Sequence, residues 1–223
     1  LQPDRLAFYS YAHVPWIKGN GQRGFNDEDI PKDDKKRMLY ETGKKLLYEN
    51  GYHEIGMDHF ALETDSLYDA FQNGTLHRNF MGYSSSKTQL MIGLGVSSIS
   101  DSWYSFAQNV KNLEDYYQIL EWNKLPVFRG HLLTNEDLII RKHILNLMCQ
   151  FETSWETKEG YFNEIPEVIL QLKEMENDGL LIIKDNGIAV IEKGKPYVRN
   201  ICMAFDLRMK RKAPETELFS MTI

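Results

Sequence analysis

Residues 51 to 61 read Gly51-Tyr-His-Glu-Ile-Gly-Met-Asp-His-Phe-Ala61, in which a short apolar strand runs directly into a polar pair. Tyr52 to Gly56 has the pattern of a β-strand, and it ends at Asp58-His59. Upstream, Arg5 to Tyr11 alternates like a strand, and an apolar-striped helix follows it and stops at Gly51. This strand–helix–strand order favours a parallel α/β layout, in which ligand-binding groups gather at the carboxyl ends of the strands.

The middle of the chain predicts three further elements from periodicity and turn residues. They are a helix from Ser66 to Gln72 stopped by Gly74, a strand from Met91 to Ile99, and a helix from Leu113 to Trp122. Within the strand, Gly93 and Gly95 indicate close backbone approaches. We therefore expect the α/β part to extend over residues 1–111.

The C-terminal part predicts helices followed by a hairpin. Thr134-Asn-Glu-Asp137 resembles a capping box before a helix from Leu138 to Phe151, and a second helix covers Glu164 to Asn177. Asp185-Asn-Gly187 is a strong hairpin signal between two short apolar runs, and a last helix surrounds Ile201. This order suggests a mostly helical, winged-helix-like domain over residues 112–223.

Composition excludes several classes of function. The 223 residues carry 42% hydrophobic residues and a net charge of -6, so a sizeable core is possible and nonspecific nucleic-acid binding is not favoured. No apolar run is long enough to span a membrane. Cys149 and Cys202 are too far apart in sequence for a disulfide framework or a metal motif, so we expect no bound metal and a reducing, cytoplasmic environment.

Several separated segments closely resemble the oxygen-independent coproporphyrinogen III oxidases, a radical S-adenosylmethionine family of heme biosynthesis. The segments are Tyr11-Ala12-His13, Gly56-Met-Asp-His-Phe-Ala61, Leu76-His-Arg-Asn-Phe80, Gly93-Leu-Gly-Val-Ser-Ser-Ile-Ser100 and Val198-Arg-Asn-Ile-Cys-Met-Ala-Phe-Asp206. The family holds its [4Fe-4S] cluster with Cys-x3-Cys-x2-Cys, which this chain lacks. The resemblance thus implies the C-terminal part of a parallel radical-SAM α/β barrel followed by the winged-helix-like domain, without the cluster-binding half and inactive by itself.

The resemblance also implies where S-adenosylmethionine binds. Ala12 and Ile99 match family positions that contact this cofactor, and Met81 stands where the oxidases generally carry a glutamine. Methionine keeps the length of glutamine and loses both hydrogen-bonding groups, so the arrangement on this side can differ. We expect Ala12 and Ile99 to share one concave surface.

Five polar residues are candidates to line the site or bind substrate: His13, Asp58, His59, His77 and Arg78. Arginine suits the four propionates of a tetrapyrrole through paired hydrogen bonds, and Arg23 and Arg129 are further candidates. From the residues alone, an Asp-His pair can equally be a loop clamp, a lone histidine a structural hydrogen-bonder, and any one arginine a surface ion pair.

By resemblance, the full enzyme oxidatively decarboxylates two propionates of coproporphyrinogen III to vinyl groups, giving protoporphyrinogen IX. Its cofactors are S-adenosylmethionine and a [4Fe-4S] cluster, and neither nucleic acid nor membrane is an expected partner. Two alternatives are a heme-chaperone relative of the same family and a winged-helix nucleic-acid-binding regulator. The context of Asp58-His59 and the ending Arg199 to Asp206 argue against the chaperone.

Overall fold

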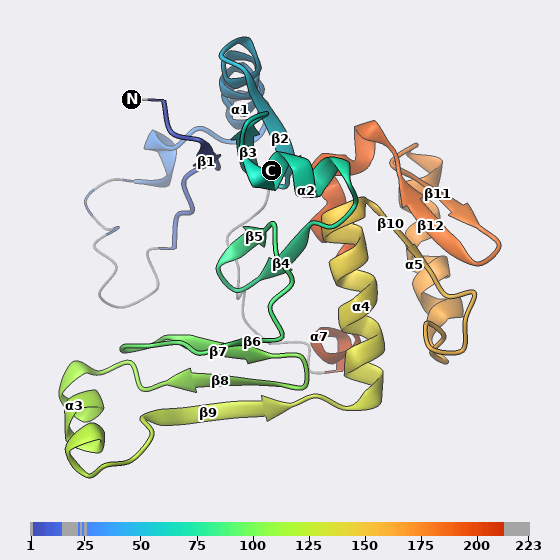
Figure 1. The fold of residues 1–223 in the computed structure, drawn as a ribbon. Helices are drawn as coiled ribbons and strands as arrows, with labels where there is room; N and C mark the ends of the chain where they lie inside the picture. The colour runs from blue at the N-terminus through green and yellow to red at the C-terminus, as the bar shows by residue number, and fades with distance from the viewer. Residues whose placement is uncertain (1, 15–21, 23, 25, 212–223) are drawn as a thin grey trace. The chain divides into compact units, whose positions relative to one another are not determined.

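The computed structural model describes residues 2–14, 22, 24 and 26–211 (Figure 1). The chain divides into two compact units. Unit 1 comprises Leu1–Asp69 with Leu207–Ile223, and unit 2 comprises Ala70–Asp206. The protein is mixed α/β, with helices and small sheets in both units. The predicted division into a barrel part, residues 1–111, and a winged-helix-like part, residues 112–223, stays a prediction.

Unit 1 is built on a three-stranded sheet in the order β1-β3-β2, with β1 at Arg5–Ala7, β2 at Tyr52–Gly56 and β3 at His59–Leu62. The predicted strand Tyr52 to Gly56 is confirmed, and the strand predicted over Arg5 to Tyr11 is shorter. The predicted parallel layout is wrong for the pairing in this sheet, because β1 and β2 both pair antiparallel with β3, which lies between them. The cause is a tight turn at Asp58, whose φ of 62° reverses the chain at once.

Helix α1, Asp33–Glu49, connects the first two strands of unit 1. It ends as predicted, since Gly51 has a φ of 83° that favours glycine after a helix. Tyr40 of α1 stacks on Phe8 with ring centroids 5.4 Å apart, and Phe60 of β3 is fully buried beside them. Three short helices complete the described secondary structure that involves this unit: the 3-10 helix η1 (Asp27–Asp29), α2 (Ser66–Gln72) and α7 (Leu207–Arg211).

The first half of unit 2 contains two antiparallel sheets (Figure 1). A hairpin joins β4 (His77–Asn79) and β5 (Gly82–Ser84), and a four-stranded sheet has the order β6-β7-β8-β9. Its strands are β6 (Leu90–Met91), β7 (Ile99–Ser102), β8 (Ser105–Asn109) and β9 (Val127–Leu132), and helix α3 (Leu113–Glu121) connects the last two. The predicted helices Ser66 to Gln72 and Leu113 to Trp122 are confirmed.

The single strand predicted from Met91 to Ile99 is wrong, because a loop separates β6 from β7. Gly95 and Ser97 have positive φ values of 95° and 56°, which no continuous strand accommodates. The predicted close approach at Gly93 is confirmed, since a Cβ there would lie 2.7 Å from the carbonyl oxygen of Ile99. The backbone that approaches Gly93 is therefore that of Ile99 in the same chain.

The second half of unit 2 contains helix α4, Asn135–Gln150, and the three-stranded antiparallel sheet β10-β12-β11. The remaining elements are β10 (Glu152–Ser154), α5 (Ile165–Asn177), β11 (Leu181–Lys184), β12 (Gly187–Val190), the 3-10 helix η2 (Glu192–Tyr197) and α6 (Val198–Met203). The Thr134–Asp137 capping box and the hairpin at Asp185-Asn-Gly187 are confirmed. Leu147, Val168, Leu172, Ile188, Ile201 and Phe205 form the center of the core.

Candidate functional site

Five residues of unit 2 form a cation–aromatic cluster. His77 lies on β4, Lys87 in the loop before β6, Trp103 and Phe106 at the β7–β8 turn and on β8, and Arg141 on α4. Of these, only His77 was predicted from the sequence as a site residue. The other four come from separate elements, and no spacing in the sequence links them.

Arg141 anchors the cluster and is fully engaged. Its guanidinium donates to the Asp101 carboxylate at 2.8 Å and to the carbonyl oxygens of Ser102 and Trp103 at 2.8 and 3.3 Å. The guanidinium carbon also lies 5.0 Å from the ring centroid of Trp103 and 4.9 Å from that of Phe106. Because both members of the ion pair are largely buried, Arg141 fixes the β7–β8 turn against helix α4.

Lys87 and the neighbouring aromatics form the more accessible side of the cluster. The Lys87 ammonium lies 5.1 Å from the Trp103 ring centroid, within cation–π range. Phe80, at the turn between β4 and β5, meets Phe106 edge-to-face with centroids 5.2 Å apart. Phe80 is 55% exposed, so an apolar surface adjoins the lysine.

His77 is buried and neutral. Desolvation, followed by the charges of Lys87 and Arg141, lowers its pKa below 6.5, while Asp101 opposes this in part. Burial is thus the main reason for the lowered pKa, and the two cations add to it. The sequence hypothesis that His77 lines a site is compatible with this position, and its role stays a prediction.

Arg78 differs from Arg141 in having no anionic partner among the described residues. Its guanidinium lies 5.5 Å from the ring centroid of Tyr83, and its buried Nε has no hydrogen-bond partner. Tyr83 itself donates its hydroxyl to the carbonyl oxygen of Met148 at 2.9 Å, which fixes the hairpin to α4. Arg129, by contrast, donates to Gln108 at 2.8 Å, and Arg23 lies outside the described residues.

Two of the three residues predicted to contact S-adenosylmethionine also lie in unit 2. Met81 is at the tip of the β4–β5 hairpin, 82% exposed, and its backbone N–H donates to Asn79 at 2.8 Å. Ile99 begins β7 and is half-buried. The loop before it is held by Asn109, whose side-chain amide donates to the carbonyl oxygens of Gly93 and Gly95.

The third, Ala12, lies in unit 1 next to His13. The Ala12 side chain is exposed, and its carbonyl oxygen accepts a hydrogen bond from the Gln22 amide at 3.0 Å. The oxygen of the same Gln22 side-chain amide accepts from the Val14 N–H, so this side chain braces the segment around His13. Ala12 and Ile99 belong to different units, and their shared surface stays a prediction.

Asp58 and His59 occupy the β2–β3 turn of unit 1. The Tyr40 hydroxyl donates to the Asp58 carboxylate at 3.3 Å, and burial together with nearby Glu54 and Asp58 raises the Tyr40 pKa. His59 makes a contact of 2.9 Å between Nδ1 and the carbonyl oxygen of Met57. These contacts show that the pair contributes to holding the turn; a further role in a site stays a prediction.

Cys149 and Cys202 are unsuited to hold a metal cluster. Both thiols are free and buried, and desolvation raises the pKa of each to about 12. A metal ligand must be a thiolate, which is disfavoured at such a pKa. Over the part of the chain that the structure describes, no group of three or more His, Cys, Asp or Glu could hold a metal ion. Within the same residues, no helix is both long and apolar enough to cross a bilayer.

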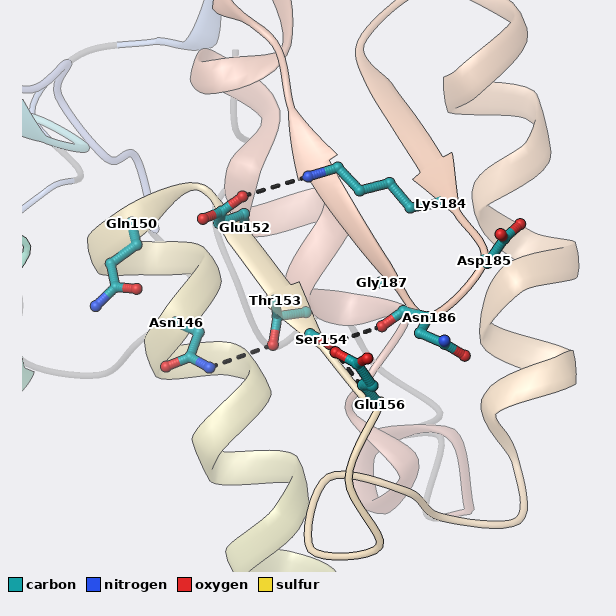
Figure 2. A pocket seen from close by; sticks show the side chains of 10 residues that line it. All are labelled: Asn146, Gln150, Glu152, Thr153, Ser154, Glu156, Lys184, Asp185, Asn186 and Gly187. Carbon is teal, nitrogen blue, oxygen red and sulfur yellow. Dashed lines mark hydrogen bonds and ion pairs between the residues drawn. The ribbon is translucent and has the colours of Figure 1, made fainter.

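A polar pocket of about 490 Å³ lies elsewhere in unit 2, between the end of α4, β10 and the β11–β12 turn (Figure 2). Most of its polar groups are already paired within the protein. Asn146 donates to Thr153 at 3.4 Å, Ser154 donates to the carbonyl oxygen of Asn186 at 2.8 Å, and Lys184 lies 3.4 Å from Glu152. None of the predicted site residues lines it, so the cation–aromatic cluster is the stronger candidate.

Comparison with known proteins agrees with the resemblance seen in the sequence. The chain is 38% identical over 96% of its length to the oxygen-independent coproporphyrinogen III oxidase of Escherichia coli, and 35% identical over its whole length to that of Synechocystis. The solved structure of E. coli coproporphyrinogen III oxidase (HemN), a radical SAM enzyme, matches 93% of the chain with a TM-score of 0.86 and 37% identity.

All three matches cover a similar share of the longer protein. The chain covers 48% and 49% of the two curated relatives and 49% of the solved chain, so it spans about half their length. No protein-family model matches it. The chain is therefore a homologue of the oxygen-independent coproporphyrinogen III oxidases, matched over about half of their length.

Proposed function

We propose that these 223 residues are the C-terminal half of an oxygen-independent coproporphyrinogen III oxidase. The observation that carries the proposal is the TM-score of 0.86 to the E. coli enzyme at 37% identity. Because the sequence identity accompanies the shared fold, the inference of related chemistry rests on more than the fold alone. The whole enzyme would oxidatively decarboxylate two propionates of coproporphyrinogen III to vinyl groups.

The finer description of the fold is part of this proposal. Residues 1–111 would contribute to the radical-SAM barrel, and residues 112–223 would form the winged-helix-like domain. The order α4, β10, α5, β11, β12 supports the second assignment, because helices alternate with a three-stranded antiparallel sheet that ends in a hairpin. The two free, buried thiols support a reducing, cytoplasmic location.

Of the two cofactors of the proposed enzyme, these residues suit S-adenosylmethionine and do not suit the iron–sulfur cluster. A [4Fe-4S] cluster does not fit, since the two cysteines are buried and protonated. S-adenosylmethionine supplies the oxidising radical in this family when the cluster reduces it. Ala12 and Ile99 offer apolar contacts that suit the adenine part of this cofactor, and neither can hold its amino-acid group.

In this proposal, the chain's own residues bind and orient the substrate and keep water away from it. The cation–aromatic cluster provides positive charge beside an apolar surface. The Tyr40–Asp58 contact and the Tyr83–Met148 hydrogen bond hold two turns that carry predicted site residues.

A hybrid enzyme tests the proposal. In it, the 223 residues replace the segment that they match in the E. coli oxidase, and anaerobic conversion of coproporphyrinogen III is measured. We expect turnover that depends on S-adenosylmethionine. The control is the same hybrid with one cluster cysteine of the E. coli part replaced by alanine, which should be inactive. A folded hybrid that holds its cluster and consumes no coproporphyrinogen III would contradict the proposal.

A further inference from the structure

We propose that Asn109 and Tyr116 are positioning residues for S-adenosylmethionine. Their side chains clamp Gly95, and they thereby fix the loop of residues 93–98 in the shape in which Ile99 contacts this cofactor. The inference rests on the proposed function, because that function supplies the cofactor. It adds one residue of β8 and one of α3 that no sequence motif connects to the loop.

Both backbone polar groups of Gly95 are bound by side chains. Its N–H donates to the Tyr116 hydroxyl at 3.2 Å, and its carbonyl oxygen accepts from the Asn109 amide at 2.9 Å. Gly95 has a φ of 95°, a conformation that is open to glycine and costly for other residues. The residue of the loop with the most conformational freedom is therefore the one that is held from both sides.

Asn109 is a buried polar residue that serves the loop along its whole length. Its side chain is 7% exposed, and an amide in the interior is destabilising unless its donors are satisfied. The amide nitrogen donates to the carbonyl oxygen of Gly93 at 3.2 Å in addition to that of Gly95. The backbone N–H of Asn109 donates to the carbonyl oxygen of Ser98 at 3.0 Å. One residue therefore holds the start, the middle and the end of the loop.

The clamped loop is mechanically connected to Ile99. The backbone of Gly93 lies so close to that of Ile99 that a Cβ on Gly93 would be 2.7 Å from the Ile99 carbonyl oxygen. Ile99 also pairs in the β7–β8 ladder with Gln108, the residue before Asn109. The loop and the first residue of β7 therefore cannot move independently of each other.

The exposed part of the loop is apolar and uncharged. Leu94 is 85% exposed and Ile92 is 67% exposed, and residues 92–99 include no charged side chain. A neutral, flat purine ring can pack on such a surface, whereas a tetrapyrrole with four propionates needs cations around it. The chemistry of the loop therefore fits the adenosyl part of S-adenosylmethionine better than it fits the substrate.

The test compares Tyr116→Phe with Tyr117→Phe in the hybrid enzyme that carries its cluster. Tyr117 is the next residue of α3 and is 58% exposed, and its ring centroid lies 6.1 Å from that of Tyr116. The control thus removes the same hydroxyl group beside the clamp without touching Gly95. Calorimetry measures S-adenosylmethionine binding in the absence of substrate. We expect Tyr116→Phe to weaken binding by about 3- to 10-fold, the effect of one lost hydrogen bond, and Tyr117→Phe to leave it unchanged.

Two further measurements test the clamp directly. In the 223-residue chain, the Gly95 amide should exchange its hydrogen at least about 3-fold faster in Tyr116→Phe than in the wild type, and at the wild-type rate in Tyr117→Phe. In the hybrid, Asn109→Ala should weaken S-adenosylmethionine binding by about 10-fold or more, because it removes both side-chain hydrogen bonds. Asn109→Gln keeps the amide and should retain more affinity than Asn109→Ala. Thermal unfolding checks that each variant is folded.

The inference is overturned if folded Tyr116→Phe binds S-adenosylmethionine like the wild type, or if Tyr117→Phe loses as much affinity. It is also wrong if Tyr116→Phe keeps its affinity for the cofactor and raises KM for coproporphyrinogen III, since the loop then serves the substrate. An unchanged exchange rate at Gly95 would show that the clamp does not hold the loop.

The outcomes for this inference and for the proposed function are separable. A hybrid that converts coproporphyrinogen III and whose cofactor affinity is the same in Tyr116→Phe refutes the inference and leaves the proposed function intact. A hybrid that binds S-adenosylmethionine, loses affinity in Tyr116→Phe and converts no coproporphyrinogen III contradicts the proposed function alone.

Discussion

Replacing His143 by alanine should destabilise unit 2 strongly. The ring is 1% exposed, and both nitrogens make contacts of 2.7 Å, Nδ1 with the Thr153 hydroxyl and Nε2 with the carbonyl oxygen of Gly160. The carbonyl can only accept, so Nε2 carries the proton and Thr153 donates to Nδ1. Phe205 stacks on the ring with centroids 5.4 Å apart, which completes an apolar wall.

The magnitude follows from these contacts. Loss of the two hydrogen bonds costs about 1 kcal/mol each. The cavity left by the ring costs about 2–3 kcal/mol more, by analogy with large-to-small changes in other cores. We therefore expect the free energy of unfolding to fall by about 4 kcal/mol in His143→Ala.

The assay is urea unfolding followed by circular dichroism, with His53→Ala as the control. His53 is on the surface, 3.0 Å from the Glu63 carboxylate, and its loss should cost no more than about 1 kcal/mol. A His143→Ala chain as stable as the control would refute the reasoning that the two hydrogen bonds and the aromatic wall stabilise this region.

The same residue predicts a pH dependence. Desolvation lowers the His143 pKa below 6.5, against the opposing effect of the Gly160 hydrogen bond. As the pH falls from about 6.5 toward the lower folded pKa, the unfolded chain takes up the proton first, so stability decreases by up to about 1.4 kcal/mol per pH unit. His77 contributes in the same direction. The difference between wild type and His143→Ala should therefore shrink with falling pH, and a constant difference would contradict the assignment.

Five more outcomes are expected. Tyr83→Phe should cost about 1 kcal/mol of unfolding free energy, measured in urea, because it removes the hydrogen bond to Met148. Asp65→Asn should remove a contribution to stability that is present above pH 4 and lost on acidification, since Arg5 and a backbone N–H offset desolvation and hold the Asp65 pKa low. Met81→Gln, in the hybrid enzyme, should change S-adenosylmethionine affinity and leave the melting temperature unchanged, because Met81 is 82% exposed. The chain should stay colourless after anaerobic incubation with iron and sulfide, and it should show no salt-sensitive micromolar binding to duplex DNA by anisotropy.

The structure also removes basic charge from the surface that could contact DNA. Arg141, Lys142 and His143 are the basic residues of α4, the long helix that a winged-helix regulator could place against DNA. The structure commits Arg141 to Asp101 and buries His143, so only Lys142 remains exposed of the three. The other basic run, Lys210 to Lys212, ends at a residue outside the described structure.

The sequence alone determined the local elements and the resemblance to the oxygen-independent coproporphyrinogen III oxidases. Periodicity, caps and turn residues act over a few neighbours, so α1, α2, α3, the Thr134 cap and the β11–β12 hairpin were predictable. The motifs of the family are likewise short and contiguous. The sequence also showed that the cluster motif is absent, because cysteines can simply be counted.

Tertiary structure decided the strand pairing and the candidate site. Strands β8 and β9 were not predicted, since their mixed polar and apolar residues are stabilised by ladders with distant partners. The antiparallel order β1-β3-β2 depends on one tight turn at Asp58. The cation–aromatic cluster brings His77 close to Arg141 across more than sixty positions of sequence, so it exists only once β4 and α4 have packed together.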